Sequence, residues 1–150
     1  MATVTSARNQ APAPNFSGVW ELNLEKSHLK GQTPQRITVR IEHDANTIHQ
    51  VVLVVSASGQ EQRDSFSFST TGEAAPVSFR GNAGETSAHW QRSTLIVEST
   101  LTVSGRELHF RDHWSLSPDG GVLTMAHPDD ELAGQVSVLE RARHNHSMLD

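Results

Sequence analysis

Hydrophobic and polar residues alternate along most of the chain in short runs, which turn-forming residues interrupt about every eight to twelve positions. An alternation with a period of two is typical of a β-strand that buries one face. The only helical signal is a turn near Leu24–Leu29. The pattern predicts about ten strands: Phe16–Leu22, Arg36–His43, Thr47–Val55, Arg63–Thr70, Val77–Arg80, Glu85–Trp90, Thr94–Thr102, Arg106–Leu116, Val122–His127 and Gln135–Arg141. Because hairpin-length turns join successive strands, we expect an all-β fold, an antiparallel up-and-down barrel of about eight to ten strands.

Two consecutive turns predict which side chains of the later strands point inward, because the length of a hairpin loop fixes the register. A two-residue turn at Ser104-Gly105 pairs these residues: Leu108 with Leu101, Phe110 with Ser99, Asp112 with Val97, and Trp114 with Leu95. The next turn, Ser117–Gly120, predicts a second set of pairs: Trp114 with Leu123, Asp112 with Met125, and Phe110 with His127. Both turns select the same apolar face: Leu95, Val97, Leu101, Leu108, Phe110, Trp114, Leu116, Leu123 and Met125. This face carries three polar residues into the barrel, Ser99, Asp112 and His127, while Glu98, His109, Arg111 and His113 face solvent.

The second hairpin gives a similar prediction for the early strands. A turn at Ala45-Asn46 selects an inward set: Ile37, Val39, Ile41, His43, Ile48, Gln50, Val52 and Val54. Val51, Leu53 and Val55 are apolar on the other face, so this strand can be covered on both sides. The loop around Ala57–Gly59 leaves the parity of the next strand open. We expect Phe66 and Phe68 inside, since two exposed phenylalanines on one strand favour aggregation.

Composition and charge narrow the class of protein. The chain has 150 residues, 35% of them hydrophobic, which suits one domain with one core. No apolar run is long enough for a transmembrane helix, and the net charge of −5 with scattered basic residues argues against nucleic-acid binding. The chain has no cysteine, which excludes disulfide frameworks, Cys-ligated zinc, iron–sulfur clusters and thiol nucleophiles. Whether the protein is a monomer or a homodimer stays open.

The two ends of the chain differ from the middle in composition. Residues 1–15 are polar, contain Pro12 and Pro14, and lack the apolar stretch of an export signal. We expect a disordered leader over residues 1–15, the barrel domain over 16–142 and a disordered tail over 143–150.

Three segments in order resemble a known superfamily. The run Asn15–Asn23, with Gly18 and Trp20 as a Gly-x-Trp, resembles the opening of the calycins, which include lipocalins and fatty-acid-binding proteins. With Trp90–Leu95 and Trp114–Gly120, the chain is similar to a group of bacterial, typically exported, lipocalin-like domains of undefined function. The resemblance covers about Phe16 to Arg141.

This resemblance carries several implications. It implies a calycin-like barrel, an extracytoplasmic location, and a Trp20 that closes the barrel floor under a basic side chain, Arg141 or Arg143. Two features of the superfamily are missing. The lipocalin Thr-Asp-Tyr segment is absent, and so is the Arg-x-Tyr-Arg carboxylate clamp of fatty-acid binders, which argues against a fatty-acid ligand.

Asp112 is the most informative polar residue, because a carboxylate between Phe110 and Trp114 on a core face needs a partner. His127 is predicted one diagonal step away on the neighbouring strand. A buried Asp–His pair holds one imidazole tautomer and suits general acid–base catalysis by Asp112 and His127. The alternatives are a structural pair, or a His127 that has already left the barrel into the following loop.

Other chemistry finds less support. The nine histidines invite a metal site, but His109 and His113 point outward and His144 and His146 lie in the tail, so we expect no metal. Haem ligation of the nitrobindin type is not matched after Trp20, so we expect no cofactor. The turn after Leu116 reads as turn chemistry rather than a phosphate loop.

Three functions remain open. The first is the binding of a small, largely apolar molecule in the barrel, the second is an acid–base enzyme (lyase, isomerase, cyclase or hydrolase) in the same cavity, and the third is a structural module with a packed interior. Trp90 and Trp114 suit either core packing or ligand contact. The predicted ligand-binding residues are these: Gln50, Phe66, Phe68, Trp90, Val97, Ser99, Phe110, Asp112, Trp114, Met125 and His127.

Overall fold

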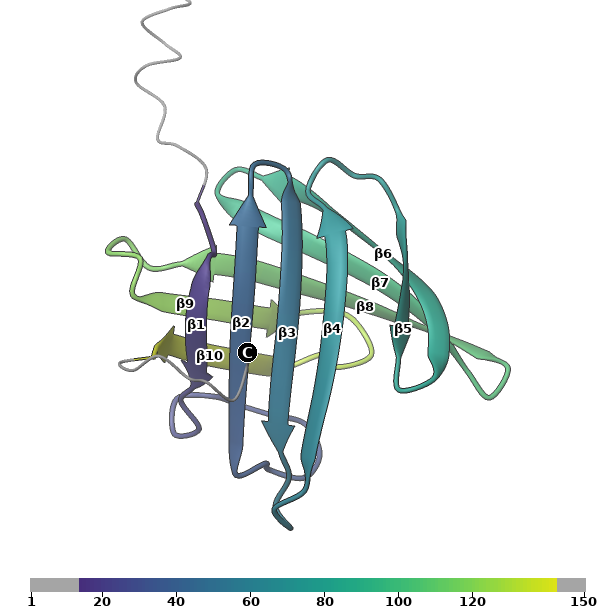
Figure 1. The fold of residues 1–150 in the computed structure, drawn as a ribbon, viewed down its shortest axis with the longest axis horizontal. Helices are drawn as coiled ribbons and strands as arrows, with labels where there is room; N and C mark the ends of the chain where they lie inside the picture. Colours follow the sequence, from purple (N-terminus) through teal and green to yellow (C-terminus); the bar gives the residue numbers. More distant parts are fainter. Residues whose placement is uncertain (1–13, 143–150) are drawn as a thin grey trace, which may run out of the picture.

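The structure is a computed structural model that describes residues 14–142, and these residues form one antiparallel sheet without helices (Figure 1). The sheet has ten strands: β1 (Gly18–Leu22), β2 (Arg36–Asp44), β3 (Thr47–Val55), β4 (Glu61–Ser69), β5 (Ala75–Phe79), β6 (Asn82–Gln91), β7 (Thr94–Val103), β8 (Arg106–Leu116), β9 (Val122–His127) and β10 (Gln135–Arg141). The segment expected as a helical turn, Leu24–Leu29, holds a turn and then a bridge between His28 and Val136. No helix within residues 14–142 is long and apolar enough to cross a bilayer.

The strands form an up-and-down barrel that is nearly closed. Consecutive strands pair with each other except β4 and β5, and β1 pairs with β10. The order of strands begins at β4 and ends at β5, so these two edges face each other without a ladder between them in the described part of the chain. In Figure 1, β2, β3 and β4 cross in front of β6, β7 and β8. The predicted fold class is confirmed.

The β2–β3 and β7–β8 hairpins have the predicted registers. Ser104 and Gly105 both adopt positive φ (53° and 76°), as a type I′ turn requires, and the turn places Asp112 opposite Val97. In the other hairpin, His43 lies opposite Ile48. The β3–β4 loop has odd length, and the ladder therefore sets Phe66 opposite Gln50 on the inner face, with Phe68 two residues further along.

The register predicted for β8–β9 is wrong by two residues. Trp114 lies opposite Met125 rather than Leu123, because Ser117–Gly121 forms a longer loop than expected. Within the loop, Ser117 N–H donates to the Val122 carbonyl at 2.9 Å, and Gly121 N–H donates to Asp119 Oδ1 at 2.9 Å. The predicted pairs Asp112–Met125 and Phe110–His127 fail for the same reason. A shift of two keeps every side chain on its predicted face, because side chains alternate with a period of two.

The Gly-x-Trp segment closes one side of the barrel through a stacked cation. Trp20 is fully buried, and the Arg141 guanidinium lies 4.3 Å from the centroid of its ring. Arg141 also donates to the carbonyls of Ser17 and Gly120, both at 3.0 Å. The expected stacking on a basic side chain of the last strand is confirmed for Arg141. Arg143, the leader through residue 13 and the tail lie outside the described residues.

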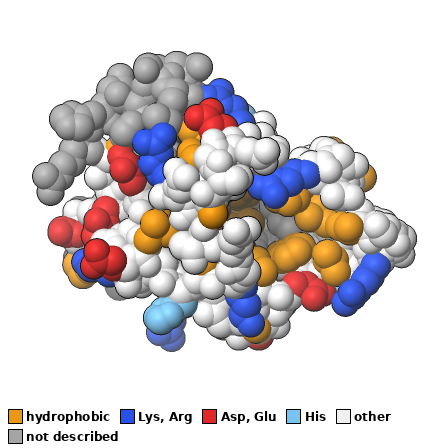
Figure 2. All heavy atoms as spheres, turned by 90° about the horizontal axis from the view of Figure 1, so that it is seen from below, with side chains coloured by type: hydrophobic (Ala, Val, Ile, Leu, Met, Phe, Trp, Pro, Cys, Tyr) orange, Lys and Arg blue, Asp and Glu red, His pale blue; other side chains and the backbone are white. Residues whose placement is uncertain are grey.

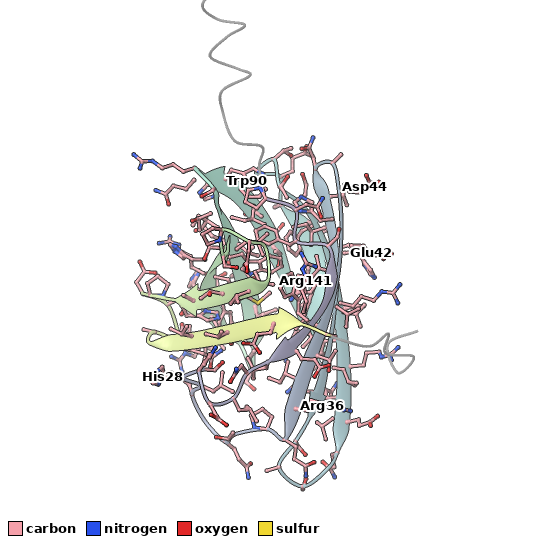
Figure 3. The ribbon with its side chains drawn as sticks, turned by 90° about the vertical axis from the view of Figure 1, so that its left-hand side faces the viewer. His28, Arg36, Glu42, Asp44, Trp90 and Arg141 are labelled. Carbon is pink, nitrogen blue, oxygen red and sulfur yellow. The ribbon has the colours of Figure 1, made fainter. Side chains whose placement is uncertain are left out.

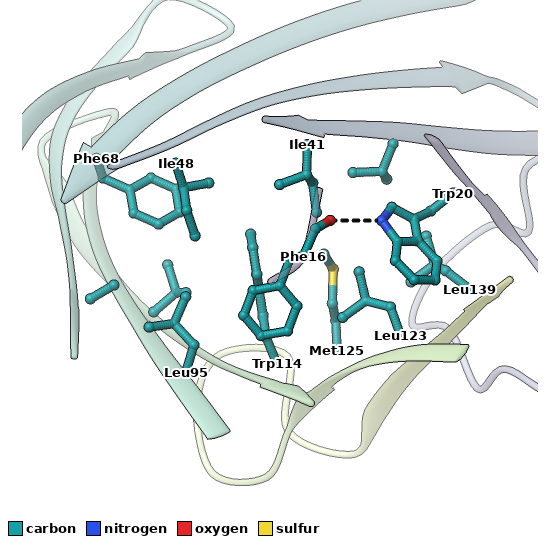
Figure 4. Packing of buried hydrophobic residues seen from close by; sticks show 13 residues of the cluster. Phe16, Trp20, Ile41, Ile48, Phe68, Leu95, Trp114, Leu123, Met125 and Leu139 are labelled. Atoms are coloured by element: carbon teal, nitrogen blue, oxygen red, sulfur yellow. Dashed lines mark hydrogen bonds between the residues drawn. The ribbon is translucent and has the colours of Figure 1, made fainter. Parts of the chain in front are cut away.

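Phe16 fills the barrel interior beside Trp20 (Figure 4), and Trp20 Nε1–H donates to the Phe16 carbonyl at 3.0 Å. The Phe16 ring stacks on His43 (5.7 Å between centroids) and Trp90 (5.8 Å), and meets Trp114 edge-on at 5.5 Å. Trp90 and Asp44 of β2 lie toward one end of the barrel, and Arg36 lies toward the other (Figure 3). Aromatic side chains therefore fill the barrel interior at the end where β2 turns into β3.

Candidate ligand cavity

The other half of the barrel is hollow. A cavity of about 500 Å³ lies between the strands, and Figure 2 shows hydrophobic side chains gathered around a hollow on the face seen from below. Along β3 the inner side chains pass from the fully buried Ile48 to the partly exposed Gln50 and Val52, which border the cavity. The residues that line it are these: Gln50, Val52, Phe66, Phe68, Val77, Phe79, Thr86, Val97, Ser99, Leu101, Phe110, Asp112, Trp114, His127, Leu132 and Gln135.

Most of the predicted ligand-binding residues share this cavity: Gln50, Phe66, Phe68, Val97, Ser99, Phe110, Asp112, Trp114 and His127. Trp90 and Met125 do not border it. Trp90 belongs to the aromatic stack on Phe16, and Met125 lies in the buried core. The cavity is compatible with ligand binding inside the barrel.

Three polar side chains meet at one wall of the cavity. His127 Nδ1 lies 2.7 Å from Asp130 Oδ2 and 3.2 Å from Asp112 Oδ1. The exposed fractions of the side chains are 8% for His127, 4% for Asp130 and 27% for Asp112, so Asp112 is the accessible carboxylate. The observed β8–β9 ladder, continued one step beyond its last pair, sets Asp112 directly opposite His127.

Asp130 is the more acidic carboxyl group of this cluster. Burial alone raises its pKa, but hydrogen bonds from the Arg111 backbone N–H, the His127 ring and the Leu132 N–H (2.8 Å) outweigh burial and hold the pKa of Asp130 below its usual range. An ionised carboxylate only accepts, so His127 Nδ1 carries the proton between them. This hydrogen bond fixes both the tautomer and the orientation of the imidazole.

The pKa of Asp112 is shifted in the opposite direction, above its usual range. Burial raises its pKa, and the negative charge of Asp130 adds to that rise, whereas His127 and the Trp114 Nε1–H, 3.4 Å from Oδ2, oppose it. The two carboxylates of the cluster are therefore pushed apart in acidity. Such a separation is common where one group holds a histidine and the other exchanges protons or ligands.

The second ring nitrogen of His127, Nε2, takes no part in the contacts with the two carboxylates. The contacts of His127 with Asp112 and Asp130 both involve Nδ1, and the residue lines the cavity. Asp112, His127 and Asp130 also bring one ligand atom each to within 4.8 Å of one another, as a metal site requires. Their distances are those of hydrogen bonds, with the Nδ1 proton in the middle.

Aromatic rings make up much of the rest of the wall. Phe66 stacks on Phe79 at 6.0 Å across the gap between β4 and β5, and Phe68 meets Trp114 edge-on at 6.0 Å. The hydroxyls of Thr86 and Ser99 bond to each other at 2.9 Å. The cavity wall is therefore mainly apolar.

Sequence reasoning missed Asp130 and Asp64, and it missed two residues that border the cavity, Leu132 in the β9–β10 loop and Gln135 at the start of β10. Asp130 follows His127 by three residues, and this His-x-x-Asp spacing after a strand was the available signal. Asp64 lies opposite Val52 on the inner face, buried, and bonds to Arg80 at 3.4 Å. The loop residues reach the cavity only because the loop folds back, which strand alternation cannot indicate.

The fold and the cavity together define a nearly closed ten-stranded β-barrel with a hollow, mainly apolar interior. No family model matches the chain, and no curated protein matches its sequence. Among solved structures, it is similar to secretory abundant heat soluble protein 4 from Ramazzottius varieornatus, with a TM-score of 0.60 and 13% identity over 90% of this chain and 100% of that one. A likeness at this identity supports the barrel fold.

Proposed function

We propose that this protein binds one small, largely apolar molecule inside the barrel. The observation that carries the proposal is the cavity of about 500 Å³, whose wall is aromatic and aliphatic apart from a few polar groups. Asp112 and His127 lie at one wall, where they can orient a single polar group of the ligand. A packed interior would offer neither the volume nor the partly exposed carboxylate.

The test compares two neighbouring residues of β3. Val52 lines the cavity and Val51 faces the other side of the sheet, so Val52→Trp fills the hollow and Val51→Trp adds the same side chain outside it. We expect apolar naphthalene ligands to bind the wild type and Val51→Trp with one-to-one stoichiometry in calorimetry. Val52→Trp should weaken that binding at least about tenfold. Equal binding by both variants would place the ligand outside the barrel.

A second function, acid–base catalysis in the same cavity, is favoured by the fixed imidazole. The 2.7 Å contact between Nδ1 and Asp130 orients His127, and the imidazole borders the cavity, as a general base requires. If His127 moves protons, a bound methyl naphthyl ketone should exchange its methyl protons in D₂O. We expect His127→Gln to slow this exchange by about 10², as followed by NMR, while ketone affinity is kept. Equal exchange in both proteins would exclude proton transfer by His127.

The family and the location belong to the same proposal. The stacking of Arg141 on Trp20 and the close approach to Gly18 support membership of the calycins, and that membership supports an extracytoplasmic location. Cell fractionation of the native host with an antibody against the barrel tests the location. Recovery in the cytosol alone would contradict it.

A further inference from the structure

We propose that the ligand is a hydrophobic amine, bound as its ammonium ion with the charge at Asp112 and the apolar body against the aromatic wall. This inference rests on the proposed binding function and names the ligand's chemical class. The geometry that points to it is a partly exposed carboxylate at the edge of an otherwise apolar, aromatic cavity.

The charge of the polar cluster favours a cation. Asp112 and Asp130 contribute two carboxylates, and His127 contributes one imidazole that can take up one proton. With a single extra proton in the cluster, whether on His127 or on Asp112, the net charge is −1. Only a second proton makes the cluster neutral. An ammonium ion therefore neutralises the free site, whereas a carboxylate ligand adds a second negative charge to it.

Asp112 is the member of the cluster that can receive the ligand. Asp130 is nearly fully buried and accepts from two backbone N–H groups, whereas the Asp112 side chain is 27% exposed, and its Oδ2 meets only a long contact from Trp114 at 3.4 Å. A carboxylate offers several acceptor positions, so the Asp112 oxygens keep capacity for an N–H donor.

The aromatic wall supports the same class of ligand. Five lining residues are aromatic, Phe66, Phe68, Phe79, Phe110 and Trp114. Ring faces attract an ammonium group and pack against an aryl or alkyl body. This wall suits an amine with a bulky apolar part better than a polar cation.

The cavity lacks the groups that an anionic ligand needs. Among the described residues that line it, none is lysine or arginine. The nearest guanidinium at the β4–β5 edge, Arg80, is already bonded to Asp64 and lies 4.6 Å over the Phe79 ring. Arg111 faces the opposite side of the sheet and pairs with Glu98 and Asp129.

The experiment measures three ligands with one apolar body: 2-(1-naphthyl)ethylamine, 2-(1-naphthyl)ethanol and 1-naphthaleneacetic acid. Titration calorimetry on the full chain at neutral pH should give the tightest binding for the amine, by about tenfold over the alcohol, and weaker binding still for the acid. An alcohol or acid that binds as tightly as the amine would overturn the amine proposal and leave the cavity function intact. No saturable binding of any of the three would instead contradict the proposed function.

Two variants locate the charge. Asp112→Asn should reduce amine affinity by about tenfold and leave alcohol affinity nearly unchanged, so the preference for the amine disappears. The matched control, Asp129→Asn, removes the same charge from the exposed outer face and should keep the preference. An equal loss in both variants, or an equal loss for all three ligands in Asp112→Asn, would overturn the role of Asp112. The comparison of the three ligands in the wild type decides the proposal even if Asp112→Asn fails to fold.

Discussion

Gly18 lies in the barrel floor at a position where the Arg141 side chain approaches the backbone closely. Its φ is +144°, and a Cβ built there lies 2.4 Å from Nη1 of Arg141, the side chain that stacks on Trp20. Glycine suits this position for two reasons: the φ of +144° strains any other residue, and a Cβ would force the Arg141 guanidinium to move. The Gly-x-Trp pattern therefore has a physical cause in this chain.

Gly18→Ala should destabilise the barrel by about 1–3 kcal/mol, because it strains φ and displaces Arg141. Urea unfolding followed by tryptophan fluorescence measures the loss. In an Arg141→Ala background the clash is gone, and the same substitution should cost less, since the two residues are in contact. Strict additivity of the two changes would show that Arg141 does not press on Gly18.

His43 links stability to pH at the packed end. Burial lowers its pKa below 6.5, and its Nδ1 accepts the Phe16 N–H at 3.2 Å, so the folded state holds the imidazole neutral. The unfolded chain binds this proton at pH values where the folded chain does not. The contribution to stability is therefore complete above about pH 6.5 and falls as the pH drops below it.

His43→Phe should remove this part of the pH dependence, since the variant has no group to protonate at that position. Unfolding free energies measured between about pH 5 and pH 8 should rise with pH in the wild type and rise less in the variant. The variant should be less stable at pH 8, because the Phe16 N–H loses its acceptor. Parallel pH curves would mean that His43 is equally protonated in both states of the chain.

Strand pairing was largely predictable because it depends on short-range turn chemistry. Ser104-Gly105 and Ala45-Asn46 fixed the β7–β8 and β2–β3 ladders. The face of Phe66 was predicted from the cost of exposing two phenylalanines, since the loop before it left the parity open. The register across the Ser117–Gly121 loop was predicted wrongly by two residues, since its side-chain hydrogen bonds build a longer turn than the expected Ser117–Gly120 turn. The prediction of the inward-facing residues stayed correct, because a register shift of two residues keeps each side chain on the same face of the sheet.

The edge between β4 and β5 is the weakest part of the sheet. β5 has five residues and pairs only with β6 in the described part of the chain, and the contacts across the edge include the Phe66–Phe79 stack and the Asp64–Arg80 ion pair. A partly exposed ion pair contributes little, so this edge opens more readily than any paired strand.

Amide hydrogen exchange should show this order. We expect β5 amides to exchange faster than those of β8, which is paired on both sides, and Arg80→Gln to speed exchange in β5 further. Mass spectrometry of peptic fragments resolves the two strands. Protection of β5 equal to that of β8 would mean that the edge is covered in solution.

The whole molecule shows where sequence reasoning reaches its limit. Alternation and turns placed Asp112 and His127 on the inner face, because each depends on neighbours close in sequence. The cavity volume depends on how a curved sheet closes, and the third member of the cluster, Asp130, depends on how the β9–β10 loop folds back. The alternation of residues along a single strand predicts neither the cavity volume nor the position of Asp130.

Ligand binding and folding should be linked across the whole barrel, because the cavity exists only when its strands have closed. At a free concentration of 2-(1-naphthyl)ethylamine 100-fold above its dissociation constant, binding adds about 2.7 kcal/mol to the unfolding free energy. For a chain of 150 residues this corresponds to a rise in Tm of about 5–10 °C. Differential scanning calorimetry measures the shift, and Val52→Trp, whose cavity is filled, should show little of it at the same concentration. Tight binding in titration calorimetry without a rise in Tm would mean that the ligand also binds the unfolded chain, and the cavity would then not be its site.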